Sequence, residues 1–310
     1  MEVQQQMAKF DKHYEGVMVP LVTPFNRAGD VDKTVFKKLI EHVIAGGATG
    51  LMPTAGTGEG VGLTRQQRYD AVTVCVEASN GKYPVVPGMI LPGLGDCIEY
   101  ANEYKRIGAD GVMLLTPYYT SLEKQEDLVD YFMRFLDATE MPLMIENLPS
   151  RTGINMLPQT MLSLSEKSPL FVSVKECVRD TMQYSEVVHY LSDRASILCG
   201  FEAMMSFAFL VGSRGGVIAT ANVFPQIYVE MLAAARAGDV GKVNDLHNKY
   251  VRPFNSAIYA TPNPGPMRTA LRHLGIETGD SILPVKRPSA AADADVIKVV
   301  GEIQSYVSSK

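Results

Sequence analysis

The sequence of 310 residues contains no tryptophan, only four cysteines and only five histidines. The lack of tryptophan decides nothing about function. The four cysteines, Cys75, Cys97, Cys177 and Cys199, lie far apart and match neither a zinc-binding nor a CxxC spacing. We therefore expect reduced, mostly buried thiols in a cytoplasmic protein.

The sequence also lacks long apolar runs and a strong charge of one sign. No run approaches the roughly 18 apolar residues of a membrane-spanning helix, and the polar segment Met1–Glu15 lacks the apolar core of a secretion signal. The net charge is −5 with both signs mixed throughout, which argues against nucleic acid or an anionic membrane as a partner. The hydrophobic content of 46% fits a globular protein with a large core.

The histidines give no sign of a metal centre. They fall in the N-terminal tail or on predicted helices: His13, His42, His189, His247 and His273. No GxSxG motif or Ser/His/Asp pattern is present either. We expect chemistry without a metal or another cofactor.

Eight short strand-like runs alternate with segments of helical period. They are Val17–Thr23, Gly50–Thr54, Pro84–Met89, Gly111–Leu115, Leu143–Asn147, Val172–Glu176, Ser196–Cys199 and Gly216–Ala219. Alternation of this kind implies parallel pairing. No Gly-rich dinucleotide loop follows the first strand, so the pattern favours a closed (β/α)₈ TIM barrel over an open doubly wound sheet.

Amphipathic segments between and after these strands predict helices. Those between strands are Asp32–Ala45, Thr64–Ala78, Gly95–Ile107, Lys124–Ala138 and Arg179–Leu191; those after Phe224 are Gln226–Arg236, Val240–Ala257, Pro264–Leu274 and Ala292–Val307. Thr64 and Gln67 have the spacing of a capping box. We divide the chain into a tail (1–15), a barrel (16–235) and a C-terminal helical region (236–310).

Lys175 ends the β-branched run Phe171–Glu176, which is typical of a buried parallel strand. A lysine in that place either extends to solvent or lies in a pocket of low dielectric. In the second case its pKa falls, and the neutral amine becomes a nucleophile toward a carbonyl.

Other polar residues lie at the carboxyl ends of the predicted strands, where the active site of such a barrel is found. The loop with Gly56 and Thr57 offers free N–H groups for a carboxylate, although a flexible turn explains it equally well. Tyr119 lies in a tyrosine pair that serves packing or proton transfer, and Arg151 serves as a carboxylate anchor or in a surface ion pair. Strand eight ends near Ile218, which we include in the predicted substrate site.

Six motifs, in order along the chain, resemble one enzyme family. They are Val19–Phe25, GTGE at Gly56–Glu59, Thr116–Tyr119, Leu148–Gly153, Val174–Glu176 and Gly216–Val223. They are similar to those of the dihydrodipicolinate synthase / N-acetylneuraminate lyase family of class I aldolases. The resemblance extends from about Gly16 to Pro284.

The resemblance implies a role for each of these residues. Lys175 would form a Schiff base with pyruvate or another 2-oxo acid, whose carboxylate would lie on the Gly56/Thr57 loop. Tyr119 matches a tyrosine that reaches across a dimer interface, and Arg151 matches an arginine that often binds the second substrate's carboxylate. Family members are usually homotetramers, built as dimers of dimers.

Two positions depart from the family pattern. Glu146 stands where a proton-shuttling tyrosine is usual, and Gly56 stands where the loop usually carries a hydroxyl. Both changes affect the same proton relay. A carboxyl beside a cationic imine can still act as a general acid or base, so we assign that role to Glu146, with Thr57 as the remaining hydroxyl.

These observations predict a lyase or synthase that acts on a 2-oxo acid, with an aldehyde as a candidate second substrate. One alternative is a dehydratase or aldolase of 2-keto-3-deoxy sugar acids. An alternative of another class is a catalytically weakened paralogue that binds a 2-oxo acid as a sensor or partner subunit.

Overall fold

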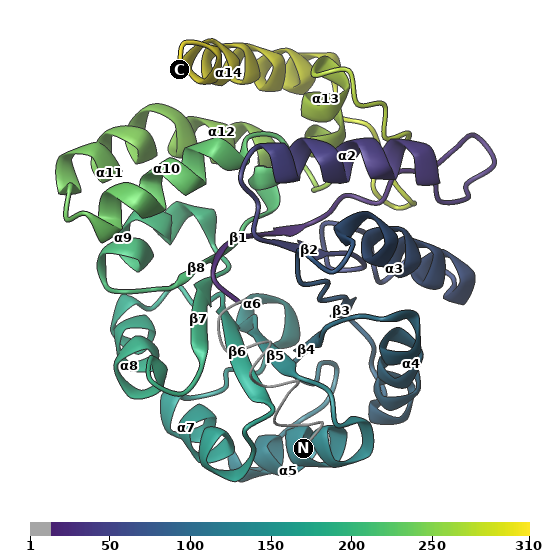
Figure 1. The fold of residues 1–310 in the computed structure, drawn as a ribbon, viewed down its shortest axis with the longest axis vertical. Coiled ribbons are helices and arrows are strands. Elements are labelled where there is room, and N and C mark those ends of the chain that lie inside the picture. The colour runs from purple at the N-terminus through teal and green to yellow at the C-terminus, as the bar shows by residue number, and fades with distance from the viewer. Residues whose placement is uncertain (1–13) are drawn as a thin grey trace.

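The computed structural model describes residues 14–310, so the predictions on residues 1–13, including His13, lie outside the described residues. Eight parallel strands form its centre (Figure 1). They are β1 (Gly16–Pro20), β2 (Gly50–Met52), β3 (Gly88–Met89), β4 (Val112–Leu115), β5 (Leu143–Asn147), β6 (Phe171–Glu176), β7 (Ser196–Cys199) and β8 (Gly215–Val217). All eight predicted strands are confirmed, with different ends for several.

The strands close into a barrel. Their order is β2-β1-β8-β7-β6-β5-β4-β3, and the two end strands meet through a bridge between Leu51 and Val85. The Val86 N–H donates to the Leu51 carbonyl at 2.9 Å across the same seam. The predicted (β/α)₈ barrel is therefore confirmed.

A ring of helices surrounds the barrel, with one ring helix after each strand (Figure 1). They are α2 (Lys33–Ala45), α3 (Arg65–Ser79), α4 (Leu94–Ile107), α5 (Glu126–Thr139), α7 (Pro158–Lys167), α8 (Thr181–Leu191), α9 (Met205–Leu210) and α10 (Pro225–Arg236). The Thr64–Gln67 capping box at the start of α3 is confirmed. Helices α7 and α9 were not predicted. α9 is only six residues long and almost entirely apolar, so it carries no amphipathic pattern.

Five strands are shorter than predicted, and the reason is clear for β3 and β1. β3 was expected to begin at Pro84, but Pro84 and Pro87 have no N–H group to donate to a neighbouring strand, so only Gly88 and Met89 form regular pairs. β1 ends at Pro20 because the chain then turns to other partners. The Val22 N–H, for example, donates to the Asn222 side chain at 3.0 Å.

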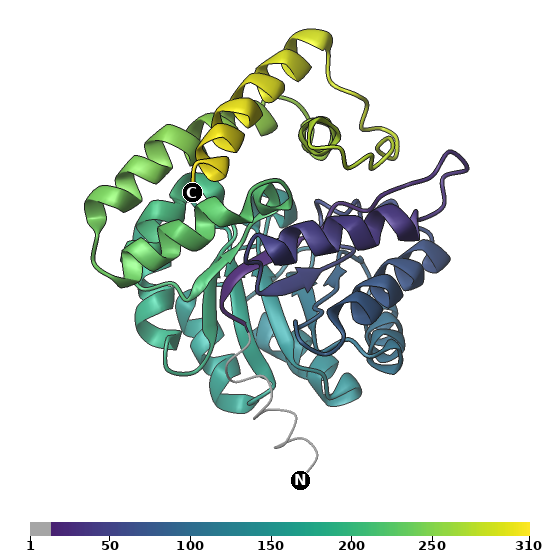
Figure 2. The ribbon, with the colours of Figure 1, turned by 45° about the horizontal axis from the view of Figure 1, so that its top comes forward.

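The helices beyond the ring form the C-terminal region (Figure 2). The predicted helix Val240–Ala257 is a continuous run of α11 (Val240–Leu246), a π-helical turn (His247–Val251) and α12 (Arg252–Ile258). α13 (Gly265–His273) and α14 (Ala290–Ser308) follow, and α14 packs on α12 and α13. The domain boundary at residue 236 stays a prediction. No helix in residues 14–310 combines the length and the apolar character needed to span a membrane.

One apolar cluster lies between the barrel and its helices, and a smaller one lies inside the barrel. Alternate side chains of a strand belong to alternate clusters. Leu143 and Ile145 of β5 point outward to the helices, whereas Met144 points into the barrel. Because side chains alternate along a strand, Glu146 points inward as well. On β6 the same rule turns Val174 outward and Lys175 inward. The core packing therefore selects which polar side chains reach the barrel interior.

Glu176 follows this alternation on the outer face of β6. Its carboxylate accepts hydrogen bonds from Asn147 Nδ2 at 3.0 and 3.2 Å and from the Val178 N–H at 3.0 Å. Burial nevertheless raises the pKa of Glu176 to about 8.

This raised pKa predicts a pH dependence of stability. Between the ordinary value of 4.5 and about 8, the folded state binds more protons than the unfolded state. The free energy of unfolding should therefore fall as pH rises through this window, by at most about 1.4 kcal/mol per pH unit. Glu176→Gln should remove that contribution. Denaturant titrations at several pH values across the window test it, with exposed Glu186→Gln as the control; equal slopes in all three proteins would contradict the prediction.

Candidate active site

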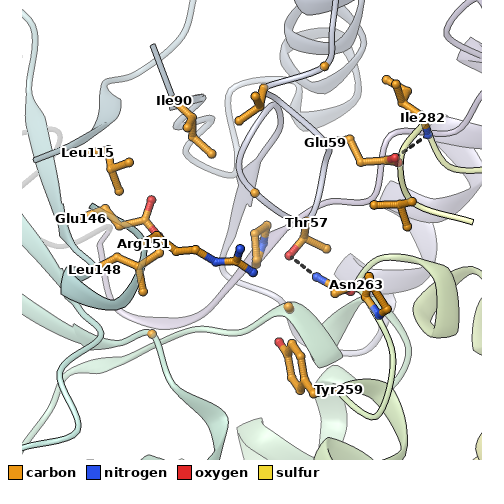
Figure 3. A pocket seen from close by; sticks show the side chains of 18 of the residues that line it. Thr57, Glu59, Ile90, Leu115, Glu146, Leu148, Arg151, Tyr259, Asn263 and Ile282 are labelled. Carbon is orange, nitrogen blue, oxygen red and sulfur yellow. Dashed lines mark hydrogen bonds between the residues drawn. The ribbon is translucent and has the colours of Figure 1, made fainter. Parts of the chain in front are cut away.

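A cavity of about 870 Å³ opens at the carboxyl ends of the strands (Figure 3). Each strand contributes a lining residue at or just after its end. They are Pro20, Gly56, Ile90, Leu115, Glu146, Lys175, Gly200 and Val217, in the order β1 to β8. The cavity also brings Thr57 and Arg151 together with these residues. The predicted gathering of polar residues at this end of the barrel is therefore confirmed.

Lys175 and Glu146 form an ion pair inside the cavity. The Lys175 Nζ atom lies 2.5 Å from Glu146 Oε1, and only 12% and 4% of the two side chains are exposed. The strand register explains the contact, because Glu146 of β5 stands directly beside Lys175 of β6. Of the two places that the sequence allowed for Lys175, the buried pocket is the right one.

The predicted fall in the pKa of Lys175 is wrong. Burial lowers this pKa, but the charge of Glu146, its hydrogen bond to Lys175 and smaller charge effects of Cys177 and Glu202 together raise it by more, so the net direction is upward. Lys175 is thus held as an ammonium ion beside a carboxylate. The Lys175 ammonium group donates a hydrogen bond to Glu146 Oε1 at 2.5 Å.

Gly200 leaves room for the aliphatic part of Lys175. A Cβ atom on Gly200 would lie 2.8 Å from both Cγ and Cε of Lys175, and 2.3 Å from the Cys177 sulfur. Burial raises the pKa of the Cys177 thiol well above its usual range, so this group stays a neutral packing partner. All four cysteines are buried free thiols, as predicted.

The loop after β2 has the features of a carboxylate-binding segment. The N–H groups of Gly56, Thr57 and Gly58 make no hydrogen bond within residues 14–310. The buried Thr57 hydroxyl accepts a bond of 3.5 Å from Asn263 Nδ2. At Gly56, an added Cβ would meet only the end of Ile90, at 3.9 Å. No other protein group therefore fills the space beside Gly56, where the family pattern predicts a side chain with a hydroxyl.

A buried ion pair fixes this loop to the C-terminal region. Glu59 pairs with Arg268 of α13, and both side chains are nearly inaccessible. Glu59 also accepts a hydrogen bond of 2.6 Å from the Ile282 N–H (Figure 3), while Arg268 donates to the Thr23 carbonyl at 2.9 Å. The C-terminal helices are therefore bonded to the loop that borders the cavity.

Arg151 and the tyrosine pair occupy different surroundings. Arg151 lies on the short helix α6 (Pro149–Thr152), and Figure 3 shows its guanidinium reaching toward Thr57. Its side chain makes no hydrogen bond or ion pair with the described residues. Tyr118 lines the cavity, whereas Tyr119 is fully exposed and does not line the cavity of its own chain. Its role across a dimer interface stays a prediction.

The structure adds two site residues and leaves one prediction open. The Ile218 side chain belongs to the core, and its neighbours Val217 and Ala219 line the cavity instead. Its substrate role stays a prediction. Glu202, just after β7, and Tyr259, just after α12, line the cavity and were not predicted. Inspection of the end of strand seven would have found Glu202, but no local signal points to Tyr259.

The sequence and the fold are similar to those of known proteins. The sequence matches the dihydrodipicolinate synthetase family over residues 13–302. The chain belongs to this family. As a member, it is a Schiff-base-forming lyase that acts on a 2-oxo acid through a lysine.

Similar proteins include the 4-hydroxy-tetrahydrodipicolinate synthase of Thermodesulfovibrio yellowstonii, 34% identical over 84% of this chain and 89% of the relative. The synthase of Nitratidesulfovibrio vulgaris is 33% identical over 93% and 99%. Among solved structures, the dihydrodipicolinate synthase of Thermotoga maritima has a TM-score of 0.89 and 26% identity, over 94% of this chain and 98% of that one. The Cyanidioschyzon merolae enzyme with lysine bound has a TM-score of 0.89 and 27% identity, over 94% and 99%.

The close approach of Gly200 to Lys175 gives a first test of the site. Gly200→Ala should reduce formation of a borohydride-trapped pyruvate adduct at Lys175 by at least about tenfold, because the new methyl group displaces the Lys175 side chain. Gly301→Ala is the control, since a Cβ at Gly301 meets nothing within 4 Å. Mass spectrometry measures the adduct; wild-type labelling of the Gly200→Ala variant would contradict the assigned packing.

The ion pair gives a second test. In Glu146→Gln the carboxylate that raises the pKa of Lys175 is gone, whereas the burial that lowers it remains. The neutral amine should then form at lower pH, and the midpoint of the pH profile for adduct formation should fall by about one unit or more. Initial rates of trapping with pyruvate over a pH series measure this midpoint. An unchanged profile would show that Glu146 does not control the charge of Lys175.

Proposed function

We propose that the enzyme uses pyruvate as its 2-oxo acid and joins the Lys175-bound enamine to an aldehyde, forming a carbon–carbon bond. The observation that carries this proposal is the buried pair of Lys175 Nζ and Glu146 Oε1, 2.5 Å apart, facing an 870 Å³ cavity. This arrangement supplies an amine nucleophile together with a group that can move protons. The relatives named above are synthases, which favours carbon–carbon bond formation.

Glu146 is proposed to take part in forming the imine. Transfer of the ammonium proton from Lys175 to Glu146 leaves a neutral amine, which attacks the ketone carbon of pyruvate to form a carbinolamine. The carboxylic acid of Glu146 then returns a proton to the leaving hydroxyl, which departs as water. The product is a protonated imine, and Glu146 is again a carboxylate beside it.

The same carboxylate is placed to act in the next step. The protonated imine withdraws electrons, so loss of a proton from C3 of pyruvate to Glu146 yields the neutral enamine. The enamine C3 then attacks the aldehyde carbon. After this bond forms, water hydrolyses the protonated imine and releases Lys175 as the ammonium ion, and Glu146 loses the C3 proton to solvent.

Two groups are proposed to hold the substrate carboxylates. The free N–H groups at Gly56 and Thr57 would bind the carboxylate of pyruvate, because successive N–H groups attract an anion. Arg151 has no protein partner in the described residues and reaches into the same cavity. It would bind an acidic group of the aldehyde through paired hydrogen bonds.

We also propose that the protein self-associates and works in the cytoplasm. The full exposure of Tyr119 on its own chain supports a role in a neighbouring site of a homodimer or homotetramer. The free, buried cysteines support a reducing compartment. The alternative of a sugar-acid dehydratase is not favoured, since the relatives compared above are synthases.

Adduct trapping tests the proposed function. Incubation with pyruvate and borohydride should add the mass of reduced pyruvate to Lys175, and Lys175→Ala should lose this adduct while keeping its fold by circular dichroism. A panel of 2-oxo acids identifies the preferred one. No adduct with any of them would contradict the Schiff-base assignment, whereas an adduct without turnover of any aldehyde would favour the weakened paralogue.

A partial reaction separates the two roles of Glu146. Exchange of the C3 hydrogens of pyruvate with deuterated solvent measures enamine formation without an aldehyde. We expect Glu146→Gln to slow this exchange and turnover by about 100-fold or more, and to slow imine formation less. Equal loss of imine formation and exchange would mean that Glu146 supports the site structurally.

A further inference from the structure

A second buried carboxyl group faces the same cavity. Glu202 follows β7, is only 3% exposed and lines the cavity together with Lys175. Its carboxylate accepts hydrogen bonds from the N–H groups of Ala219 at 3.0 Å and Thr220 at 3.3 Å. These bonds hold it at the end of β8, and no step proposed above uses it.

A tyrosine from the C-terminal region completes this group. The Tyr259 hydroxyl donates to Glu202 Oε1 at 3.2 Å and to Oε2 at 3.3 Å. Although 43% of Tyr259 is exposed, Figure 3 shows it among the residues that face the cavity. Among the described residues, the Tyr259 hydroxyl is the only group that donates a hydrogen bond to Glu202 Oε2.

Lys175 lies between the two acidic groups. β6 has β5, with Glu146, on one side and β7 on the other. The Lys175 side chain packs over Gly200, two residues before Glu202, and the charges of Lys175 and Glu202 influence each other. The site thus offers one proton-transfer group on each side of the imine-forming lysine.

The proposed reaction needs two different proton transfers. Glu146, in contact with Lys175 Nζ, can serve the imine and C3. When the enamine attacks the aldehyde, the carbonyl electron pair moves onto the aldehyde oxygen, which must gain a proton. A donor other than Glu146 can serve this oxygen if it lines the same cavity, as Tyr259 does.

We propose that Tyr259 is the catalytic residue that donates a proton to the aldehyde oxygen during carbon–carbon bond formation, with Glu202 as its positioning residue. This inference rests on the proposed function. As the new bond forms, the Tyr259 O–H bond breaks and the alkoxide becomes a hydroxyl. A proton from solvent restores the phenol after product release, while the Glu202 carboxylate keeps the Tyr259 hydroxyl in place by accepting its hydrogen bond.

The surroundings of Glu202 suit this part. Burial raises the pKa of Glu202, while hydrogen bonds from the Thr220 N–H and the Tyr259 hydroxyl oppose this rise and hold the carboxylate in place. Thr220, which lies beside Glu202, is hydrogen-bonded to the Tyr228 hydroxyl at 2.5 Å. The hydroxyls of Tyr259 and Thr220 therefore both donate to the Glu202 carboxylate.

Tyr259→Phe tests the proposal, because it removes only the hydroxyl. Three measurements are compared: the trapped pyruvate adduct at Lys175, C3 exchange of pyruvate, and condensation with acetaldehyde, glyceraldehyde or succinic semialdehyde. We expect adduct and exchange to stay within about twofold of wild type, and condensation to fall by about 100-fold. Tyr190 is a partly exposed tyrosine of α8 outside the cavity. Tyr190→Phe is therefore the matched control and should leave all three measurements unchanged.

Glu202→Gln is the second variant and should show the same split with a smaller loss of condensation. If Tyr259→Phe loses exchange and condensation equally, the hydrogen bond between Tyr259 and Glu202 only stabilises the structure of the site. That result would overturn the proposal. Unchanged condensation in that variant would overturn it while leaving the proposed function intact. A wild-type enzyme without an adduct, or with an adduct but no condensation of any of the three aldehydes, would overturn both.

Discussion

The site depends on the ion pair between Lys175 and Glu146. The two residues stand side by side on adjacent strands and both point into the barrel, because the residues before them, Val174 and Ile145, pack outward against the helices. A shift of one residue in either strand would turn its polar side chain away from the cavity. The packing of the apolar core therefore also determines that this ion pair lies in the cavity.

This pair also determines the direction in which the pKa of Lys175 shifts. In a buried site, an unpaired lysine would lose its proton and become a ready nucleophile. Here the Glu146 carboxylate raises the pKa of Lys175, so the charges of the two residues are coupled.

The C-terminal helices belong to the active site. Arg268 of α13 pairs with Glu59 of the loop after β2, and the segment between α12 and α13 brings Tyr259 and Asn263 to the cavity. A barrel alone would leave the Glu202 carboxylate without its phenol partner. The helical extension therefore supplies side chains that line the cavity and bond to its other residues.

The sequence by itself determined the eight strands, the barrel class, and the candidates Lys175, Glu146, Arg151 and the Gly56/Thr57 loop. These follow from local patterns: apolar strands, the residues that end them, and motifs of fixed spacing. Only the tertiary structure decided the direction of the Lys175 pKa, because that depends on a contact across 29 residues of chain. It alone paired Glu202 with Tyr259, 57 residues apart, because a hydrogen bond between distant segments leaves no period or spacing in the sequence.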